Sequence, residues 1–366
     1  MTNKLARGFD TVLMRYLPQL LCFEVKPNCM YTRVDYMRLL VNSSVLNAYA
    51  EGMSNVSNKL GAGVPNADTA LMYFKSIDRY ELQSVVSIVL EEQVVELKRK
   101  GLLKRPVPIA FDWHDQMFYG DHYTAEMVNG TRPKDGSSYA YQYLTASILV
   151  DGKRLTIVLT PIKSREHIID YVKDALNRIR NMGVRVRYLL FDGGFSSLEL
   201  PSWLQENGYM YAIHFTPNAV TKRMGLKDGE AASYPSSDSP FKLVRVDDRG
   251  TTTTTTTTTK ISYLFATNMI CRPKRLLKRY KTRWGVETTY REHNLFLPRT
   301  KSKNYTVRLL YYAVAVCIYN AWCVLNAFED DCSEQEEEVD RHVIALEVKL
   351  FILLTFLVPA ATWERR

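Results

Sequence analysis

Three carboxylates in this 366-residue chain stand where they could do chemistry on phosphate groups. Asp112 ends the apolar run PVPIAFD, Asp192 ends the apolar run VRVRYLLFD, and Glu287 lies in the polar stretch YKTRWGVETTYREHN. Mg²⁺ prefers oxygen ligands, and a pair of such ions can activate an attacking oxygen and stabilise a leaving one. Gathered together, the three side chains would suit metal-assisted phosphoryl transfer. Asp112 would bridge two Mg²⁺ or Mn²⁺ ions, Asp192 would be a second ligand, and Glu287 would hold the other ion.

The stretch around Glu287 predicts a helix with a polar stripe. At about 100° per residue, one face of a continuous helix would carry a tyrosine, two arginines, a glutamate and an asparagine. These residues are Tyr280, Arg283, Glu287, Arg291 and Asn294. The apolar residues of the stretch scatter around the helix instead of forming the stripe that a core-facing helix shows. The polar face therefore indicates a role other than packing.

Basic residues gather beside this stripe. The chain carries a net charge of +9 even though residues 329–340 form an acidic run. A solvated helix face is one reading of the cations, but a basic run beside carboxylates is also what binding DNA phosphates near a metal site requires. The run and its continuation are Arg272, Lys274, Arg275, Lys278, Arg279, Lys281, Arg283, Arg299, Lys301, Lys303 and Arg308. The charge pattern favours DNA as the partner.

The first hundred residues have helical spacing and no strand pattern. We predict helices over 34–46, 47–60, 67–77 and 80–100. The segment GAGVPNADTALMYFKSI indicates a helix, a tight turn and a second helix, which Asn66 or Asp68 would cap. It could be a helix-turn-helix that enters the major groove, or a plain segment of a helical bundle. We expect residues 1–101 to form a helical, DNA-binding domain.

The pattern changes after residue 105. The order becomes strand, hairpin, helix, strand, helix, strand, helix, with a turn-rich, β-rich insertion over about 216–260 that contains a nine-threonine tract. This order predicts a ribonuclease H-like α/β domain over 106–328, with a mixed sheet and flanking helices. Asp112 and Asp192 would end neighbouring parallel strands, and the helix carrying Glu287 would reach the same edge. An acidic linker and a C-terminal helix would occupy 329–366.

Cysteine spacing and hydropathy bear on the compartment. The six cysteines form no CxxC pair, which indicates reduced thiols in a cytosol, and no N-terminal stretch has the pattern of a signal peptide. Residues 309–328 are long enough to cross a bilayer, but Asn320 and Asn326 interrupt them, and Pro359 interrupts the shorter run 350–363. We interpret both as buried core helices and expect no membrane partner.

The chain resembles insertion-sequence transposases of the DDE type, whose third block reads Y-(2)-R-(3)-E-(6)-K. Tyr280, Arg283 and Glu287 match that block in identity and spacing. The segments IAFDWHDQMFYG and LLFDGGFSS are similar to the two aspartate blocks of that family. The resemblance spans roughly residues 106–322. It implies a DNA transposase that cuts at transposon ends and joins them to target DNA.

The resemblance also implies a site and partners. Asp112, Asp192 and Glu287 would be the catalytic residues and the ligands of two divalent ions. The partner would be double-stranded DNA, as terminal inverted repeats and as target, bound by a homodimer in the prokaryotic cytoplasm, at the nucleoid. The implied DNA contacts are Tyr280, Arg283, Arg291, Asn294, Lys274, Arg275, Lys278, Arg279, Arg299 and Lys301.

Two departures from the family pattern leave alternatives open. The lysine of the third block is Asn294 here, and Gly193 stands where relatives often have arginine. A transposase-derived protein that binds DNA without cutting it is therefore one alternative, and a paired-carboxylate hydrolase of sugar chains is another. His114 and Asp115 could form a different metal cluster, although strand alternation favours placing His114 in a loop beyond the strand. We expect His293 to lie at the surface.

Overall fold

The computed structural model describes residues 15–150, 153–235, 241–250, 259–327 and 344–357, and the side chains of 153, 249–250, 259–260 and 284–288 lie outside that description. The strands are β1 Val107–Met117, β2 Val128–Lys134, β3 Ser137–Val150, β4 Lys153–Ile162, β5 Val186–Phe191, β6 Tyr211–His214, β7 Ala231–Ser233, β8 Lys242–Gly250 and β9 Thr259–Thr267. They form one nine-stranded sheet in the order β2-β3-β1-β5-β6-β9-β8-β7, with β4 also paired to β3. The predicted insertion therefore extends the same sheet through β7 and β8, and β9, which begins at its end, returns the chain to β6; most of the threonine tract lies outside the described residues.

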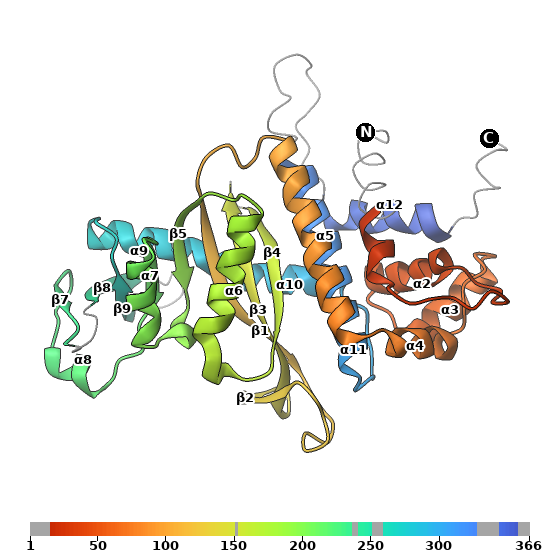
Figure 1. Cartoon of the computed structure of the whole chain (residues 1–366), viewed down its shortest axis with the longest axis horizontal. Helices are drawn as coiled ribbons and strands as arrows, with labels where there is room; N and C mark the ends of the chain where they lie inside the picture. The colour runs from red at the N-terminus through yellow and green to blue at the C-terminus, as the bar shows by residue number, and fades with distance from the viewer. Residues whose placement is uncertain (1–14, 151–152, 236–240, 251–258, 328–343, 358–366) are drawn as a thin grey trace, which may run out of the picture.

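Helices cover both faces of the sheet and continue beyond its edge (Figure 1). Their bounds are α2 Arg33–Val45, α3 Ala50–Lys59, α4 Ala67–Ser76, α5 Arg79–Arg99, α6 Ile168–Asn181, α7 Glu199–Glu206, α8 Ala219–Met224, α9 Pro273–Lys281, α10 Gly285–His293, α11 Tyr305–Ala327 and α12 Ala345–Leu357. The predicted N-terminal helices agree with α2 to α5, and Asn66 caps α4 by accepting a hydrogen bond from the Thr69 amide at 2.8 Å. The fold is the predicted mixed α/β arrangement with an N-terminal helical region.

The two faces of the sheet belong to different apolar clusters. Along β1, Ile109 and Phe111 pack with α6 and α7, whereas Ala110 faces the cluster that contains residues of α9. Alternation along β5 follows the same rule, with Phe191 on the α6 and α7 face. Because side chains alternate along a strand, Asp112 lies on the face of α9 and α10 and Trp113 on the opposite face.

The strand β1 is longer than the sequence indicates. Its parallel pairing with β5 ends at Phe111 and Phe191, but its antiparallel pairing with β3 continues to Met117. The expected strand end at Asp112 and the expected loop at His114 are therefore wrong. Antiparallel hydrogen bonds to β3 hold the backbone extended after the parallel neighbour has turned away.

An apolar core joins the N-terminal helices to the rest of the chain. Buried residues of α2, α4 and α5 share one cluster with α11 and α12 and with Tyr141 and Leu155 of the sheet. In Figure 1, α5 and α11 run side by side between the sheet and the helices α2 to α4. Of the described helices, α11 alone is long and apolar enough to cross a membrane, and 83% of that window is buried here, as expected for a core helix. The core thus crosses the predicted domain boundary at residue 101.

Asn320 fastens α5, α11 and β4 together inside this core. Its amide nitrogen donates to Gln93 Oε1 and to the Thr156 carbonyl, each at 2.8 Å, and its oxygen accepts from the Thr156 amide at 3.1 Å. Asn320 is 2% exposed. Removing the amide would leave buried polar groups of α5 and β4 without these hydrogen bonds.

We predict that Asn320→Ala lowers the free energy of unfolding by about 2–4 kcal/mol, because buried donors and acceptors would lose their hydrogen bonds. Denaturant unfolding of the full chain measures this change. Asn177→Ala is the matched control, since Asn177 is an exposed asparagine on α6, and it should shift stability by less than about 0.5 kcal/mol. Equal effects of the two substitutions would contradict the role of Asn320.

Candidate active site

Asp112 and Asp192 meet at the carboxyl side of the β1–β5 pair. Their preceding residues, Phe111 and Phe191, are register partners in the parallel ladder, and the two rings stack with centroids 4.8 Å apart. Parallel neighbours present their carboxyl ends at one sheet edge, so the two aspartates leave the pair side by side. The backbone register thus places the two aspartates on neighbouring strands at the same level, and their role as joint metal ligands stays a prediction.

A tight turn after β5 fixes Asp192. Its Oδ1 accepts a hydrogen bond from the Gly194 amide at 3.0 Å and thereby caps the 3-10 turn Gly193–Phe195. Phe195 stacks on Trp113 with centroids 4.4 Å apart. A Cβ on Gly194 would lie 2.9 Å from the Trp113 ring, so this position requires glycine, whereas a Cβ on Gly193 would approach its nearest neighbour only to 3.4 Å. Packing therefore does not explain why residue 193 is glycine, where relatives often have arginine.

Asp112 forms a buried ion pair with Arg283. The arginine Nη1 donates to Asp112 Oδ2 at 2.9 Å, with side-chain exposures of 6% for Arg283 and 8% for Asp112. Burial acts to lower the pKa of Arg283, but the carboxylates of Asp112 and Asp192 and the Tyr280 hydroxyl outweigh it and raise this pKa above its usual value. Arg283 therefore keeps its charge, and its Nε has no hydrogen-bond partner.

The expected continuous helix is broken into four segments. They are α9, the 3-10 turn η5 Thr282–Trp284, α10 and the 3-10 turn η6 Asn294–Phe296. The Thr282 hydroxyl donates to the Arg279 carbonyl at 2.6 Å and so competes with the backbone N–H groups for that acceptor, which weakens the helix. Gly285 follows, and glycine also weakens a helix because of its backbone freedom. The expectation of one polar helical face is therefore wrong.

Tyr280 lies inside the protein and not on a polar face. It is 1% exposed and packs on Phe265 with centroids 4.7 Å apart. Burial raises its pKa to about 12. The Arg283 guanidinium lies 5.4 Å from the centre of its ring. In this structure Tyr280 supports Arg283 and offers no surface to a ligand.

A hydrogen-bond chain ties α10 to the strand that carries Asp112. The Tyr290 and Thr145 hydroxyls are 2.6 Å apart, and Thr145 donates to the Asp112 carbonyl at 3.3 Å. Thr145 is also the residue opposite Asp112 in the antiparallel ladder. Tyr290 follows Glu287 by one helical turn, so these hydrogen bonds hold the helix of Glu287 at the level of Asp112. The Glu287 side chain itself lies outside the described residues.

Two histidines near the Tyr290–Thr145 hydrogen bond are buried and neutral. His114 stacks on Tyr312 with centroids 4.3 Å apart, and burial lowers its pKa to about 3. His293 is fully buried, with its Nδ1 3.4 Å from the Tyr312 hydroxyl, and burial together with His114 holds its pKa well below the usual value. The expectation that His293 is a surface residue is wrong, because α10 turns this side toward α11.

No group of three or more His, Cys, Asp and Glu side chains is placed to hold a metal among the described residues, which leave out Glu287. Asp115 pairs with Arg165 at 3.1 Å and accepts from Thr131 and Gln142. It does not join His114 in a metal cluster. The side chains whose chemistry fits Mg²⁺ or Mn²⁺ are the hard carboxylates of Asp112 and Asp192. Asp112 already has a positive neighbour, the Arg283 guanidinium.

The basic residues divide between two places. Lys274, Arg275 and Lys278 are exposed on α9, and the Arg279 guanidinium lies 5.5 Å from the centre of the Tyr188 ring. Lys281 pairs with Asp248 at 2.5 Å. The second group is exposed and lies in the last turn of α10 and in the segment after it; it comprises Arg291, Arg299 and Lys301, with the polar Asn294 between them. Both groups flank the segment that carries Arg283 and Glu287.

Sequence reasoning missed Thr145 and Tyr290. Tyr290 lies three residues after Glu287 in the stretch YKTRWGVETTYREHN, a spacing that places the two side chains on the same side of a helix. Thr145 interrupts the apolar run YQYLTASILV, but only the strand register reveals that it faces Asp112.

Residues 106–320 match the family model described as the transposase DDE domain. No curated protein matches the sequence significantly. The fold is similar to that of the piggyBac transposase in a synaptic complex with hairpin DNA, with a TM-score of 0.57 and 12% sequence identity, over 99% of this chain and 81% of that one.

We predict that the buried histidines make the protein less stable in mild acid. Below the ordinary histidine pKa of about 6.5, His114 and His293 bind protons in the unfolded chain but stay neutral in the folded protein, because burial lowers their pKa. The free energy of unfolding therefore falls as pH falls. Between about pH 7 and about pH 5 the loss should be about 2 kcal/mol per histidine.

Urea unfolding at the two pH values measures this loss. His114→Phe keeps an aromatic ring on Tyr312 and should remove about half of the pH dependence. His167→Gln is the control, because the His167 side chain is 70% exposed. An unchanged pH dependence in His114→Phe would contradict the assignment.

Proposed function

We propose, from the premise that this chain belongs to the transposase DDE domain family, that it is a DNA transposase that cuts strands at transposon ends and joins them to target DNA. The observation that carries the proposal is the pairing of Asp112 and Asp192 at one edge of the sheet, with a buried arginine on Asp112. The family membership sets aside the hydrolase of sugar chains.

Asp112, Asp192 and Glu287 would hold the divalent ions, Mg²⁺ or Mn²⁺, and two are proposed. When bound, such ions activate an attacking oxygen and stabilise a leaving one. The buried position of Asp112 excludes water around its carboxylate, which strengthens its hold on a cation. Arg283, which keeps its charge beside the same carboxylate, would offset the negative charge that a bound phosphate brings.

The basic residues of both groups, together with Asn294, would position DNA by its phosphates. Those of α9 and those after α10 flank the carboxylate edge, so a duplex end between them would meet positive charge on both sides. The proposed contacts are Lys274, Arg275, Lys278, Arg279, Arg291, Asn294, Arg299 and Lys301. The similar piggyBac structure is a complex with DNA, which supports DNA as the partner here. A homodimer on DNA and a place in the prokaryotic cytoplasm remain part of the proposal.

We predict that Asp192→Asn abolishes strand cleavage and leaves folding intact. Asparagine can still accept the Gly194 hydrogen bond, so the turn is kept while the charge that holds a metal is lost. Nicking of end-containing DNA in Mg²⁺ or Mn²⁺ should fall on the order of a thousandfold. Glu287→Gln should behave alike. DNA affinity and melting temperature should stay near those of the parent protein.

Two comparisons make this experiment decisive. Asp170→Asn, an exposed carboxylate on α6, should cut as the parent does. Asp112→Asn should lose both activity and stability, because it leaves the Arg283 charge buried without its partner. A parent protein that binds DNA and never nicks it would favour the DNA-binding derivative, and nicking restored by Asn294→Lys would locate the defect. Full activity in Asp192→Asn would refute the proposed site.

We predict that Tyr290 and Thr145 act as positioning residues for the metal ligands. Tyr290→Phe and Thr145→Val each remove the hydrogen bond between α10 and β3, so the helix of Glu287 loses its anchor. Cleavage should slow about tenfold, and the Mg²⁺ concentration for half-maximal cleavage should rise. Thr145→Ser keeps the hydroxyl and should restore both values. An unchanged Mg²⁺ requirement in Tyr290→Phe would show that the bond serves packing alone.

A further inference from the structure

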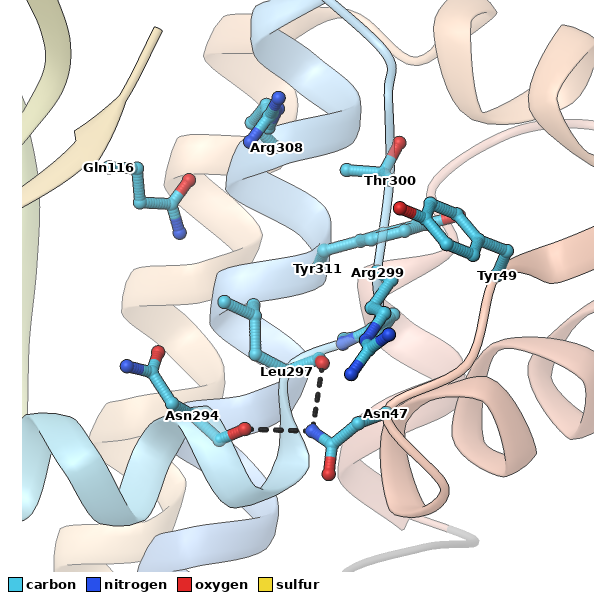
Figure 2. A pocket seen from close by; sticks show the side chains of 10 residues that line it. Asn47, Tyr49, Gln116, Asn294, Leu297, Arg299, Thr300, Arg308 and Tyr311 are labelled. Atoms are coloured by element: carbon cyan, nitrogen blue, oxygen red, sulfur yellow. Dashed lines mark hydrogen bonds between the residues drawn. The ribbon is translucent and has the colours of Figure 1, made fainter. Parts of the chain in front are cut away.

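A cavity of about 490 Å³ lies where four parts of the chain meet (Figure 2). The loop between α2 and α3, the end of β1, the segment after α10 and the helix α11 each contribute side chains. The lining residues are Asn47, Tyr49, Gln116, Asn294, Leu297, Pro298, Arg299, Thr300, Arg308 and Tyr311. A volume of this size holds one small organic molecule or one nucleotide and is too small for a base pair with its backbone.

The wall of the cavity is built by specific bonds. Asn47 has a positive φ of 49°, and its amide donates to the carbonyls of Asn294 at 2.7 Å and Leu297 at 3.1 Å, as Figure 2 shows. The Arg299 amide donates to the Ala48 carbonyl at 3.1 Å. Lys349 of α12 donates to the Asn47 oxygen at 3.2 Å. The segment after α10 is thus held against the N-terminal helices, and the cavity is preformed.

The charges of the cavity favour an anion. Its lining includes two arginines and no acidic residue. Arg308 donates from Nε to the Ser302 carbonyl at 2.8 Å, which orients its guanidinium, and Arg299 is exposed. Lys301 lies beside the rim, 6.0 Å from the centre of the Tyr49 ring. Arginine forks match phosphate oxygens better than other donors do.

Polar and aromatic groups of the cavity suit a nucleobase. Gln116 is 8% exposed, and its side-chain oxygen is buried without a hydrogen-bond partner. An unsatisfied buried acceptor is stabilised by a ligand that donates a hydrogen bond, as amino and imino groups of bases do. Tyr49 is 44% exposed, and a base can stack on its ring.

The cavity also lies near the candidate active site. Gln116 follows Asp112 by four residues on the same face of β1, which places it about 13 Å away along the strand. Asn294 directly follows α10, the helix of Glu287. A DNA strand held at the carboxylates can therefore extend to this cavity within a few nucleotides.

We propose that this cavity binds one unpaired nucleotide, with its phosphate on Arg299 and Arg308 and its base on Gln116 and Tyr49. The proposal rests on the proposed function for the source of the nucleotide, which is a DNA strand; a free nucleotide has the same chemistry. The cavity thereby selects DNA ends that carry an unpaired nucleotide over fully paired ends.

The test uses the full chain without divalent metal, so that no strand is cut. The probes are a duplex with the fluorescent base aminopurine as its one unpaired nucleotide, the same duplex with aminopurine paired, and aminopurine deoxynucleoside monophosphate. We expect the unpaired duplex to bind about tenfold more tightly than the paired one, with a change in aminopurine fluorescence. Gln116→Leu and Arg299→Gln should each remove that preference.

Arg223→Gln is the matched control, because Arg223 is an exposed arginine on α8 and should leave the preference intact. Arg299→Gln alters an exposed side chain and decides the question even if Gln116→Leu fails to fold. Equal binding of both duplexes, with no binding of the free nucleotide, would overturn the proposal. Binding of the free nucleotide alone would keep the pocket and remove DNA as its source. A preference for the unpaired duplex in a protein that never nicks DNA would refute the proposed function and leave the pocket standing.

Discussion

The parallel register between β1 and β5 is the constraint on which the candidate site depends. Phe111 and Phe191 are partners at the last step of that ladder, and each is followed by an aspartate. A slip of one residue in β1 would turn Asp112 to the face of α6 and α7, away from Arg283. The apolar clusters on both faces oppose such a slip, because it would also bring Phe111 into the space of Ala110. Packing of the sheet therefore places the carboxylates.

Much of this arrangement can be predicted from sequence, for a physical reason. Apolar runs that end in aspartate indicate buried strands, and parallel neighbours align their ends, so Asp112 and Asp192 could be placed together without coordinates. The segment around Arg283 could not. A periodicity argument treats polar residues as surface residues, but Arg283 is buried because Asp112 compensates its charge, and Tyr280 is buried beneath it. Tertiary contacts overrode the local helical pattern.

Buried polar residues account for most of what sequence reasoning missed. His114, Gln116 and Thr145 lie in or opposite the extension of β1 beyond its parallel neighbour, where antiparallel pairing to β3 sets which residues face α10 and α11. Their roles depend on the strand register and on how the helices pack on the sheet, and residue spacing predicts neither of these. His293 shows the same limit, since a histidine on a short polar helix gives no sign of which neighbour will cover it.

The common core of α5 and α11 ties the evolution of the two halves of the chain together. Asn320 and Gln93 bond to each other through their side chains, and Asn320 also bonds to the backbone of Thr156, so a change at Asn320 or Gln93 constrains the other. A chimera joined at residue 101 would combine an α5 from one protein with an α11 from another and would mismatch that pair. The N-terminal helices therefore do not behave as an exchangeable cassette: substitutions can change their outer surface only while their inner surface stays matched to α11.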